Sequence, residues 1–148
     1  MNGMVERYKP EWKEDFERLN RAWIDKYFRL EPADIEVFQD PEAYILKGGG
    51  QIFFVLDQGV PVGTVGVKCL EDGSMELVKM AVEDAHQGKG LARELCEHAL
   101  QFAKAAGVKK VVLYTNSLLL PALKLYASLG FVQVPQEEGL YDRADVKM

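Results

Sequence analysis

The chain changes from a strand-like to a helix-like pattern across one short loop that contains glycine. Residues 76–82 are mainly apolar and predict a strand, whereas residues 90–106 carry apolar side chains at helical spacing. Gly88 and Gly90 lie between the two segments. The first backbone N–H groups of a helix have no partner within the helix, and they bind phosphate well. The sequence therefore predicts a site for a phosphate-bearing ligand where this strand meets this helix.

Two common kinds of phosphate-binding loop do not fit the spacing. A Walker-type loop needs Ser or Thr after Gly-Lys, but Lys89 is followed by Gly90. A dinucleotide fingerprint needs a third glycine where Arg93 stands and an acidic residue about 20 positions further on, where the chain has Val108-Lys109-Lys110. Neither a P-loop nor a Rossmann site is expected.

The pattern along the rest of the chain predicts a mixed α/β fold, with antiparallel hairpins first and a strand–helix–strand unit in the middle. The expected strands are Met4–Lys9, Gln51–Leu56, Val60–Leu70, Ser74–Val82, Lys110–Thr115, Phe131–Val134 and Tyr141–Met148. The expected helices are one that begins at Pro10 and has a single apolar face (Trp12, Phe16, Leu19, Trp23, Tyr27), a broken acidic segment within Glu31–Leu46, then Gly90–Ala106 and Pro121–Leu129. With no repeat or linker, residues 1–148 are expected to form one domain.

Charge and composition exclude several classes of function. The 148 residues include 18 Lys and Arg against 23 Asp and Glu, a net charge of −5, which argues against nucleic acid as a ligand. No apolar stretch approaches the roughly 20 residues that span a bilayer, and the first residues contain no signal-like apolar core, so no membrane partner and a cytoplasmic location are expected. Two cysteines and two histidines without metal-ligand spacing predict neither a disulfide nor a metal site.

The loop itself resembles that of a known family. Gln87, Gly90 and Ala92 form the pattern Gln-x-x-Gly-x-Ala at the start of the predicted helix. This pattern resembles the acetyl-CoA pyrophosphate loop of the GCN5-related N-acetyltransferases, the GNAT superfamily. Further residues stand in the family's order after the loop: Asn116, Ala122, Tyr126, Gly130 and Phe131. The resemblance implies the GNAT fold, a central, mostly antiparallel mixed sheet flanked by about four helices, with acetyl-CoA as the acyl donor and no metal.

The resemblance also implies which residues bind acetyl-CoA. The main chain of the strand end would pair with the pantetheine arm, the loop would hold the pyrophosphate, and two later residues would contact the cofactor. These residues are Met80, Ala81, Val82, Gln87, Gly88, Lys89, Gly90, Leu91, Ala92, Asn116 and Ala122. Asn116 can equally be a turn or capping residue, and Met80 an ordinary core residue. Lys89 and Arg93 either screen phosphate charge or belong to a solvated face.

Acetyl transfer to an amine needs a group that accepts the amine's proton and one that assists the departing thiolate. Glu76 is the candidate base, acting directly or through water, because its place before Val82 is similar to that of the base in the histone-acetylating branch. Strand periodicity would put Glu76 on one face with Val78, Met80 and Val82, and Lys79 on the other. A solvated carboxylate is the alternative. Tyr126 is the candidate general acid, or alternatively a core tyrosine.

The sequence thus predicts an N-acetyltransferase that acetylates a primary amine of a small molecule or peptide. The alternatives are a non-catalytic acyl-CoA-binding module and an acyltransferase with a longer acyl donor. The acceptor is expected to be cationic, because the run from Glu31 to Glu42 has five acidic residues and no basic one, and Gln136–Asp142 adds three more. Family resemblance also suggests homodimers, for which an edge strand at Tyr141–Met148 would be available.

Overall fold

A single twisted sheet organises the molecule. The computed structural model describes residues 4–135 and 146–148, and within them the sheet has six strands in the order β1-β2-β3-β4-β5-β6. All neighbouring pairs are antiparallel except β4 and β5, which are parallel. The strands are β1 (Met4–Arg7), β2 (Gln51–Asp57), β3 (Val60–Cys69), β4 (Met75–Val82), β5 (Val111–Thr115) and β6 (Val146–Lys147). The expected mixed, mostly antiparallel sheet is confirmed.

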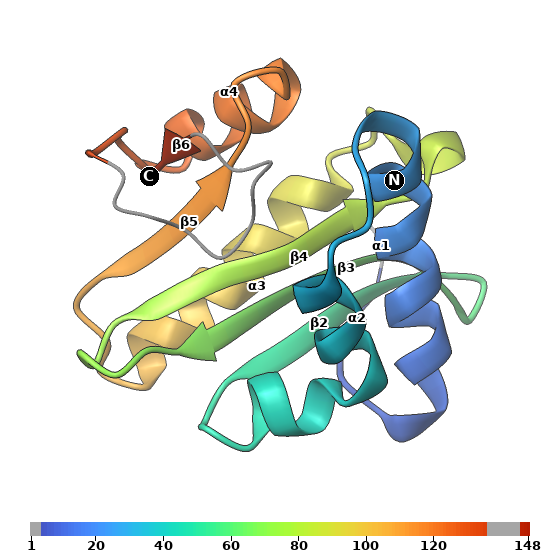
Figure 1. Ribbon diagram of the computed structural model, residues 1–148, viewed down its shortest axis with the longest axis horizontal. Helices are drawn as coiled ribbons and strands as arrows, with labels where there is room; N and C mark the ends of the chain where they lie inside the picture. Colours follow the sequence, from blue (N-terminus) through green and yellow to red (C-terminus); the bar gives the residue numbers. More distant parts are fainter. Residues whose placement is uncertain (1–3, 136–145) are drawn as a thin grey trace.

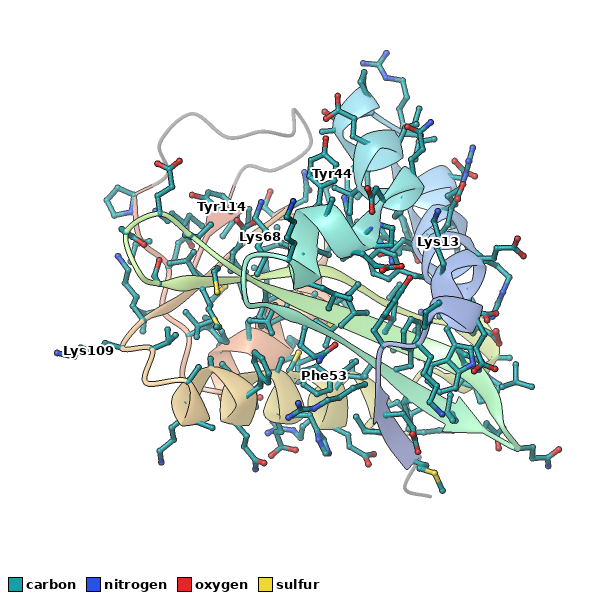
Figure 2. All side chains as sticks on the ribbon, turned by 90° about the horizontal axis from the view of Figure 1, so that it is seen from below. Lys13, Tyr44, Phe53, Lys68, Lys109 and Tyr114 are labelled. Atoms are coloured by element: carbon teal, nitrogen blue, oxygen red, sulfur yellow. The ribbon has the colours of Figure 1, made fainter. Side chains whose placement is uncertain are left out.

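Helices cover both faces of this sheet. Helix α3 lies along one face, and α1 and α2 lie on the other (Figure 2). Their bounds are α1 (Lys13–Tyr27), α2 (Pro32–Gln39), α3 (Leu91–Ala105) and α4 (Leu120–Ser128). Short helical turns occupy Pro10–Trp12, Glu42–Leu46 and Asp84–His86. Pro10 and Pro32 each stand in a first turn, where the missing N–H of proline costs nothing.

Two apolar cores result from the alternation of side chains along the strands. On β2, Phe53 and Val55 pack with α3, whereas Ile52 and Phe54 pack with the aromatic residues of α1 and α2. Since both faces are buried, β2 and β3 are apolar at successive positions rather than at every second one. The sheet is therefore held rigidly between two layers of helices.

A β-bulge interrupts β4 in the middle of the predicted site. Val78 pairs with Gly66 and Ala81 with Thr64, so Lys79 and Met80 lie together opposite one residue of β3. Lys79 has a φ of 55°, the left-handed conformation that position one of a G1-type bulge requires and that glycine usually supplies. The extra residue reverses the alternation of faces beyond it.

The bulge overturns one prediction about faces. Val78 packs with the core beside α1 and α2, but Met80 and Val82 pack with the core beside α3. The prediction that Met80 and Val82 share one face with Glu76 is therefore wrong, whereas Val78, two residues after Glu76, does share it. Lys79 lies on the same face as Val78, where it reaches α2. Its predicted separation from the face of Glu76 is also wrong.

Strands β4 and β5 separate soon after they meet. They pair only from Met75 with Val111 to Leu77 with Leu113, and beyond that point β5 turns to pair with β6. Figure 1 shows the two arrows diverging, with β5 rising toward α4. The two strands therefore splay apart, and among the described strands none pairs with the end of β4 on this side.

The C-terminal region differs from its predicted hairpin. Residues 131–134 form no strand, and Val134 makes only an isolated bridge to Lys147. Most of the predicted last strand, residues 141–145, lies outside the described residues, so the edge proposed for a dimer stays a prediction. Among the helices that the structure describes, none has the length and apolar character to cross a membrane.

Candidate active site

A cavity of about 600 Å³ opens where β4 and β5 separate. It is lined by the end of β4, the glycine loop, the start of α3, the end of β5, α4 and the last turn of α1. Of the residues predicted from sequence, it brings together Glu76, Met80, Ala81, Val82, Gln87, Gly88, Gly90, Leu91, Ala92, Asn116, Ala122 and Tyr126, and also Arg93. Lys89 is exposed and does not line it.

The glycine loop has an open, preformed shape. Gly88 and Gly90 have φ values of 80° and 79°, and Gly90 caps the N-terminus of α3. A Cβ atom at either glycine would meet no other atom within 4 Å, so the space beside the loop is open to a ligand. The side chain of Gln87 donates hydrogen bonds to the carbonyl oxygen of Val82 (3.2 Å) and to Asp84 (3.3 Å). Gln87 thus connects the loop to the end of β4. The open loop at the N-terminus of α3 suits a pyrophosphate group.

Glu76 is a half-buried carboxylate on the cavity wall. Burial raises its pKa above the ordinary value for glutamate, and the charges of Lys68, Lys79 and Lys147 act in the opposite direction. A carboxylate with a raised pKa is a stronger base than an exposed one. The environment of Glu76 therefore suits proton abstraction.

Tyr126 reaches the cavity from α4 and is buried. Its hydroxyl lies 3.9 Å from the sulfur of Met80, and the thiol of Cys96 lies 3.4 Å from the same sulfur. Burial raises the pKa of Tyr126 well above its usual range. The phenol therefore stays protonated and can donate a hydrogen bond. Burial also raises the pKa of Cys96 to about 12, which makes this thiol a poor nucleophile.

Two features of the cavity escaped the sequence analysis. The first is an aromatic wall at the end of α1, formed by Trp23, Tyr27 and Phe28. The indole and phenyl rings of Trp23 and Phe28 pack edge to face at 5.9 Å, while Tyr27 is 54% exposed. The apolar face of this helix thus extends beyond the core at its last turn, where Tyr27 lies exposed beside the cavity.

The second feature is a buried ion pair between Lys79 and Asp34, whose side chains are 5% and 0% exposed. One carboxylate oxygen of Asp34 binds the ammonium, and the other accepts the backbone N–H of Glu31 at 2.9 Å in a capping box. The ammonium also lies over the ring of Phe38. This ion pair connects the bulge of β4 to the start of α2.

We expect Asp34→Ala to lower the free energy of unfolding by about 3–5 kcal/mol, because it leaves the ammonium of Lys79 buried and uncompensated. Urea unfolding measures the loss. Asp25→Ala removes a carboxylate from an exposed position of α1 and serves as the control, with a change within about 0.5 kcal/mol. A loss below about 1 kcal/mol for Asp34→Ala would show that the pair does not hold the bulge.

Asn116 follows β5 and has the turn role that its sequence position left open. Its side-chain oxygen accepts the N–H of Leu118 at 2.8 Å, and its carbonyl oxygen accepts the N–H of Leu119. It therefore shapes the turn into α4. It also lines the cavity, so contact with a cofactor stays a prediction.

A glycine loop at a helix N-terminus is a typical binding site for phosphate groups, and here it opens between two splayed strands. Residues 6–131 match the model of the Acetyltransferase (GNAT) family. The chain therefore belongs to the GNAT family, as the sequence predicted.

Known relatives and structures agree with this assignment. N-acetylaspartate synthetase from Danio rerio is 40% identical over 119 residues, and human N-acetyltransferase 8B is 31% identical over 119 residues. These matches cover 79% and 77% of this chain but 40% and 50% of the relatives, so the chain spans half of their length or less.

Solved structures share the fold at low identity. An acetyltransferase of the GNAT family from Staphylococcus aureus matches with a TM-score of 0.88 and 18% identity, covering 97% of this chain and 95% of that one. The Salmonella typhimurium protein yncA, solved with its cofactor acetyl-CoA, matches with a TM-score of 0.75 and 20% identity, covering 100% and 94%. These likenesses establish the fold.

Proposed function

We propose that the protein transfers an acetyl group from acetyl-CoA to a primary amine. One observation supports this proposal above the others: a single cavity joins the glycine loop to Glu76 on β4 and Tyr126 on α4. The loop offers backbone N–H groups to the pyrophosphate of the coenzyme, and the unpaired end of β4 offers main-chain groups to its amide-containing arm. Acetyl-CoA supplies the activated acyl group. Side chains around the cavity accept the proton of the amine and stabilise the leaving thiolate.

Glu76 is proposed as the base. An alkylammonium with a pKa near 10.4 is almost entirely protonated at pH 7, so its neutral form costs roughly 4–5 kcal/mol. Before the nitrogen attacks the thioester carbonyl, the ammonium proton passes to the carboxylate of Glu76, directly or through water. Burial makes this carboxylate more basic, while the neighbouring lysines help it to stay ionised before the proton arrives.

Tyr126 is proposed as the group that assists the leaving thiolate. Its buried phenol is protonated at working pH and faces the sulfur of Met80 rather than a strong acceptor. It donates a hydrogen bond to the thiolate as the carbon–sulfur bond breaks, and the thiolate then takes up the second proton, which the acylated nitrogen releases. Because a phenol is a weaker acid than a thiol, the hydrogen bond rather than complete proton transfer accounts for most of the stabilisation.

We expect Glu76→Gln to reduce kcat/KM most strongly near neutral pH, where few acceptor amines are already neutral. The defect should shrink as the pH approaches the pKa of the amine. Thiol release measured from pH 6 to 10 tests this, with Glu71→Gln in the exposed hairpin turn as the control. A defect that is constant with pH would count against Glu76 as the base.

The same variant separates catalysis from folding. The raised pKa means that the folded chain binds this proton more tightly than the unfolded chain, so ionised Glu76 costs folding free energy above its unfolded pKa. Glutamine removes that cost. The melting temperature of Glu76→Gln at pH 7 should therefore equal or exceed that of the wild type while its activity falls.

A non-catalytic acyl-CoA-binding module is the alternative, and it predicts coenzyme binding without turnover. Steady release of thiol with a panel of primary amines distinguishes the two. Acetyl, propionyl and succinyl donors compared in the same assay test the preference for a short acyl chain. If none of the amines caused thiol release at any concentration, the result would favour the binding module.

The acceptor could be a cationic amine or an amino acid, and the positions of the acidic residues bear on this choice. The five acidic residues between Glu31 and Glu42 do not line the cavity, and several have structural partners, as when Glu36 and Glu42 accept the hydroxyls of Tyr44 and Tyr8. The acidic residues of Gln136–Asp142 lie outside the described residues. The N-acetylaspartate synthetases are named for a product made from an amino acid. We therefore propose an amino acid or related small molecule as the acceptor and keep the cationic amine as the alternative.

A further inference from the structure

Basic side chains surround Glu76 on the face of the sheet opposite α3. Lys68 of β3 pairs directly with Glu76 of β4 in the antiparallel register, so the two side chains lie on the same face. Cross-strand pairs of this kind have Cβ atoms about 4.5–5.5 Å apart. Lys68 is half-buried and does not itself line the cavity, but its charge acts on Glu76, which does line it.

The row of polar residues continues on the other side of Glu76. Val112 of β5 pairs with Glu76, and Tyr114, two residues further on, projects to the same face and lines the cavity. Lys147 of β6 pairs with Tyr114, and its ammonium lies 5.5 Å from the centre of that ring. Figure 2 shows Lys68 and Tyr114 on one side of the sheet and Phe53 on the side of α3.

The lysines of this row differ in their partners. Lys68, Lys79 and Lys147 are the charged groups that act on Glu76. The ammonium of Lys79 is engaged by Asp34. Lys68 forms no ion pair with any residue in the described part of the chain. A protein whose net charge is −5 thus carries positive charge beside its candidate base.

We propose that Lys68 binds a carboxylate of the acceptor and so directs the acceptor's amine to Glu76. The inference rests on the proposed amine acetylation and specifies the class of substrate: a primary amine that carries a carboxylate close to the nitrogen, as an amino acid does. A lysine ammonium is a flexible point charge that suits an anionic group, and the same charge repels a cationic amine. In the reaction the new carbon–nitrogen bond replaces the carbon–sulfur bond, the ammonium proton goes to Glu76, the second proton of the nitrogen goes to the departing thiolate, and the carboxylate stays on Lys68.

A competing role for Lys68 is to keep Glu76 ionised without touching the substrate. The two roles differ in their dependence on the acceptor. A change in the basicity of Glu76 slows every amine alike at a given pH, whereas the loss of a carboxylate contact affects only amines that carry a carboxylate. Two substrates that differ in the carboxylate alone therefore separate the roles.

The test compares aspartate with aspartic acid diamide, which keeps the amine and lacks both carboxylates. The wild type should favour aspartate in kcat/KM, and Lys68→Gln should reduce that preference by about 10- to 100-fold, mainly through KM, as expected for a contact between charged groups. Lys68→Arg should retain most of the preference. Lys109→Gln removes the same charge at a position that Figure 2 shows projecting away from the sheet, and it should leave the preference unchanged.

A second measurement does not require turnover. N-acetylaspartate, the product of the test reaction, should bind the CoA-saturated wild type in calorimetry and bind Lys68→Gln about 10-fold or more weakly. Product binding without turnover of any amine would contradict the proposed function but support the carboxylate site. Turnover in which the diamide or a cationic amine is preferred, or in which Lys68→Gln slows both substrates equally, would overturn the carboxylate site and leave the acetyltransferase intact.

Discussion

Gly90→Asp is expected to abolish coenzyme A binding while the domain stays folded. The new carboxylate would occupy the open space beside the loop and repel the pyrophosphate from the N–H groups at the start of α3. Each lost hydrogen bond to a charged group is worth about 1.5–3 kcal/mol, so the affinity should fall about 100-fold or more. Titration calorimetry with coenzyme A measures the loss.

Two controls separate charge from backbone strain. Gly107 ends α3 with a φ of 81° and equally open surroundings, so Gly107→Asp places the same side chain in the same conformation far from the cavity. Asparagine at position 90 has the shape of aspartate without its charge, and it should bind the coenzyme more tightly than Gly90→Asp does. At either position, Asp or Asn in the left-handed conformation should lower the free energy of unfolding by about 1 kcal/mol. Coenzyme affinity close to that of the wild type in Gly90→Asp would refute the location of the pyrophosphate.

The sequence predicted the glycine loop well because the loop depends on local rules. A strand, two glycines with positive φ and the start of an amphipathic helix are each encoded within a few neighbouring residues. The same holds for most strand and helix positions, whose ends differ from the predicted ones by one or two residues. Phe131–Val134 did not form a strand, and only Val134 bridges to Lys147, so an apolar run alone does not determine a strand.

The bulge at Lys79 could not be predicted from the neighbouring residues. A lysine at positive φ is uncommon, and nothing in the neighbouring sequence requires it. Its partner Asp34 is 45 residues away, in a segment whose acidic composition suggested an exposed face. Only the folded chain brings the two together, and the contact leaves Asp34 buried and paired, so that this carboxylate is not available to attract a cationic acceptor.

Tyr126→Phe should lower kcat by about 100- to 10,000-fold, the usual effect of losing one positioned proton donor. Phenylalanine keeps the ring and its edge-to-face packing against Phe131 at 5.9 Å. The only partner of the hydroxyl among the described residues is the sulfur of Met80 at 3.9 Å, a weak acceptor. The melting temperature and the affinity for coenzyme A should therefore change little. Steady-state thiol release, calorimetry and thermal unfolding measure the three quantities.

The comparison with a second tyrosine makes this result specific. Tyr8 donates its hydroxyl to Glu42 at 3.3 Å, away from the cavity, and burial followed by the charge of Glu42 raises its pKa to about 12. Tyr8→Phe therefore deletes a similarly perturbed phenol and should leave kcat near the wild-type value. If Tyr126→Phe also turned over normally, Tyr126 would be a core residue alone, and the thiolate would need another donor. If both variants lost activity together with stability, the defect would lie in packing, because a proton donor acts on kcat without lowering the melting temperature.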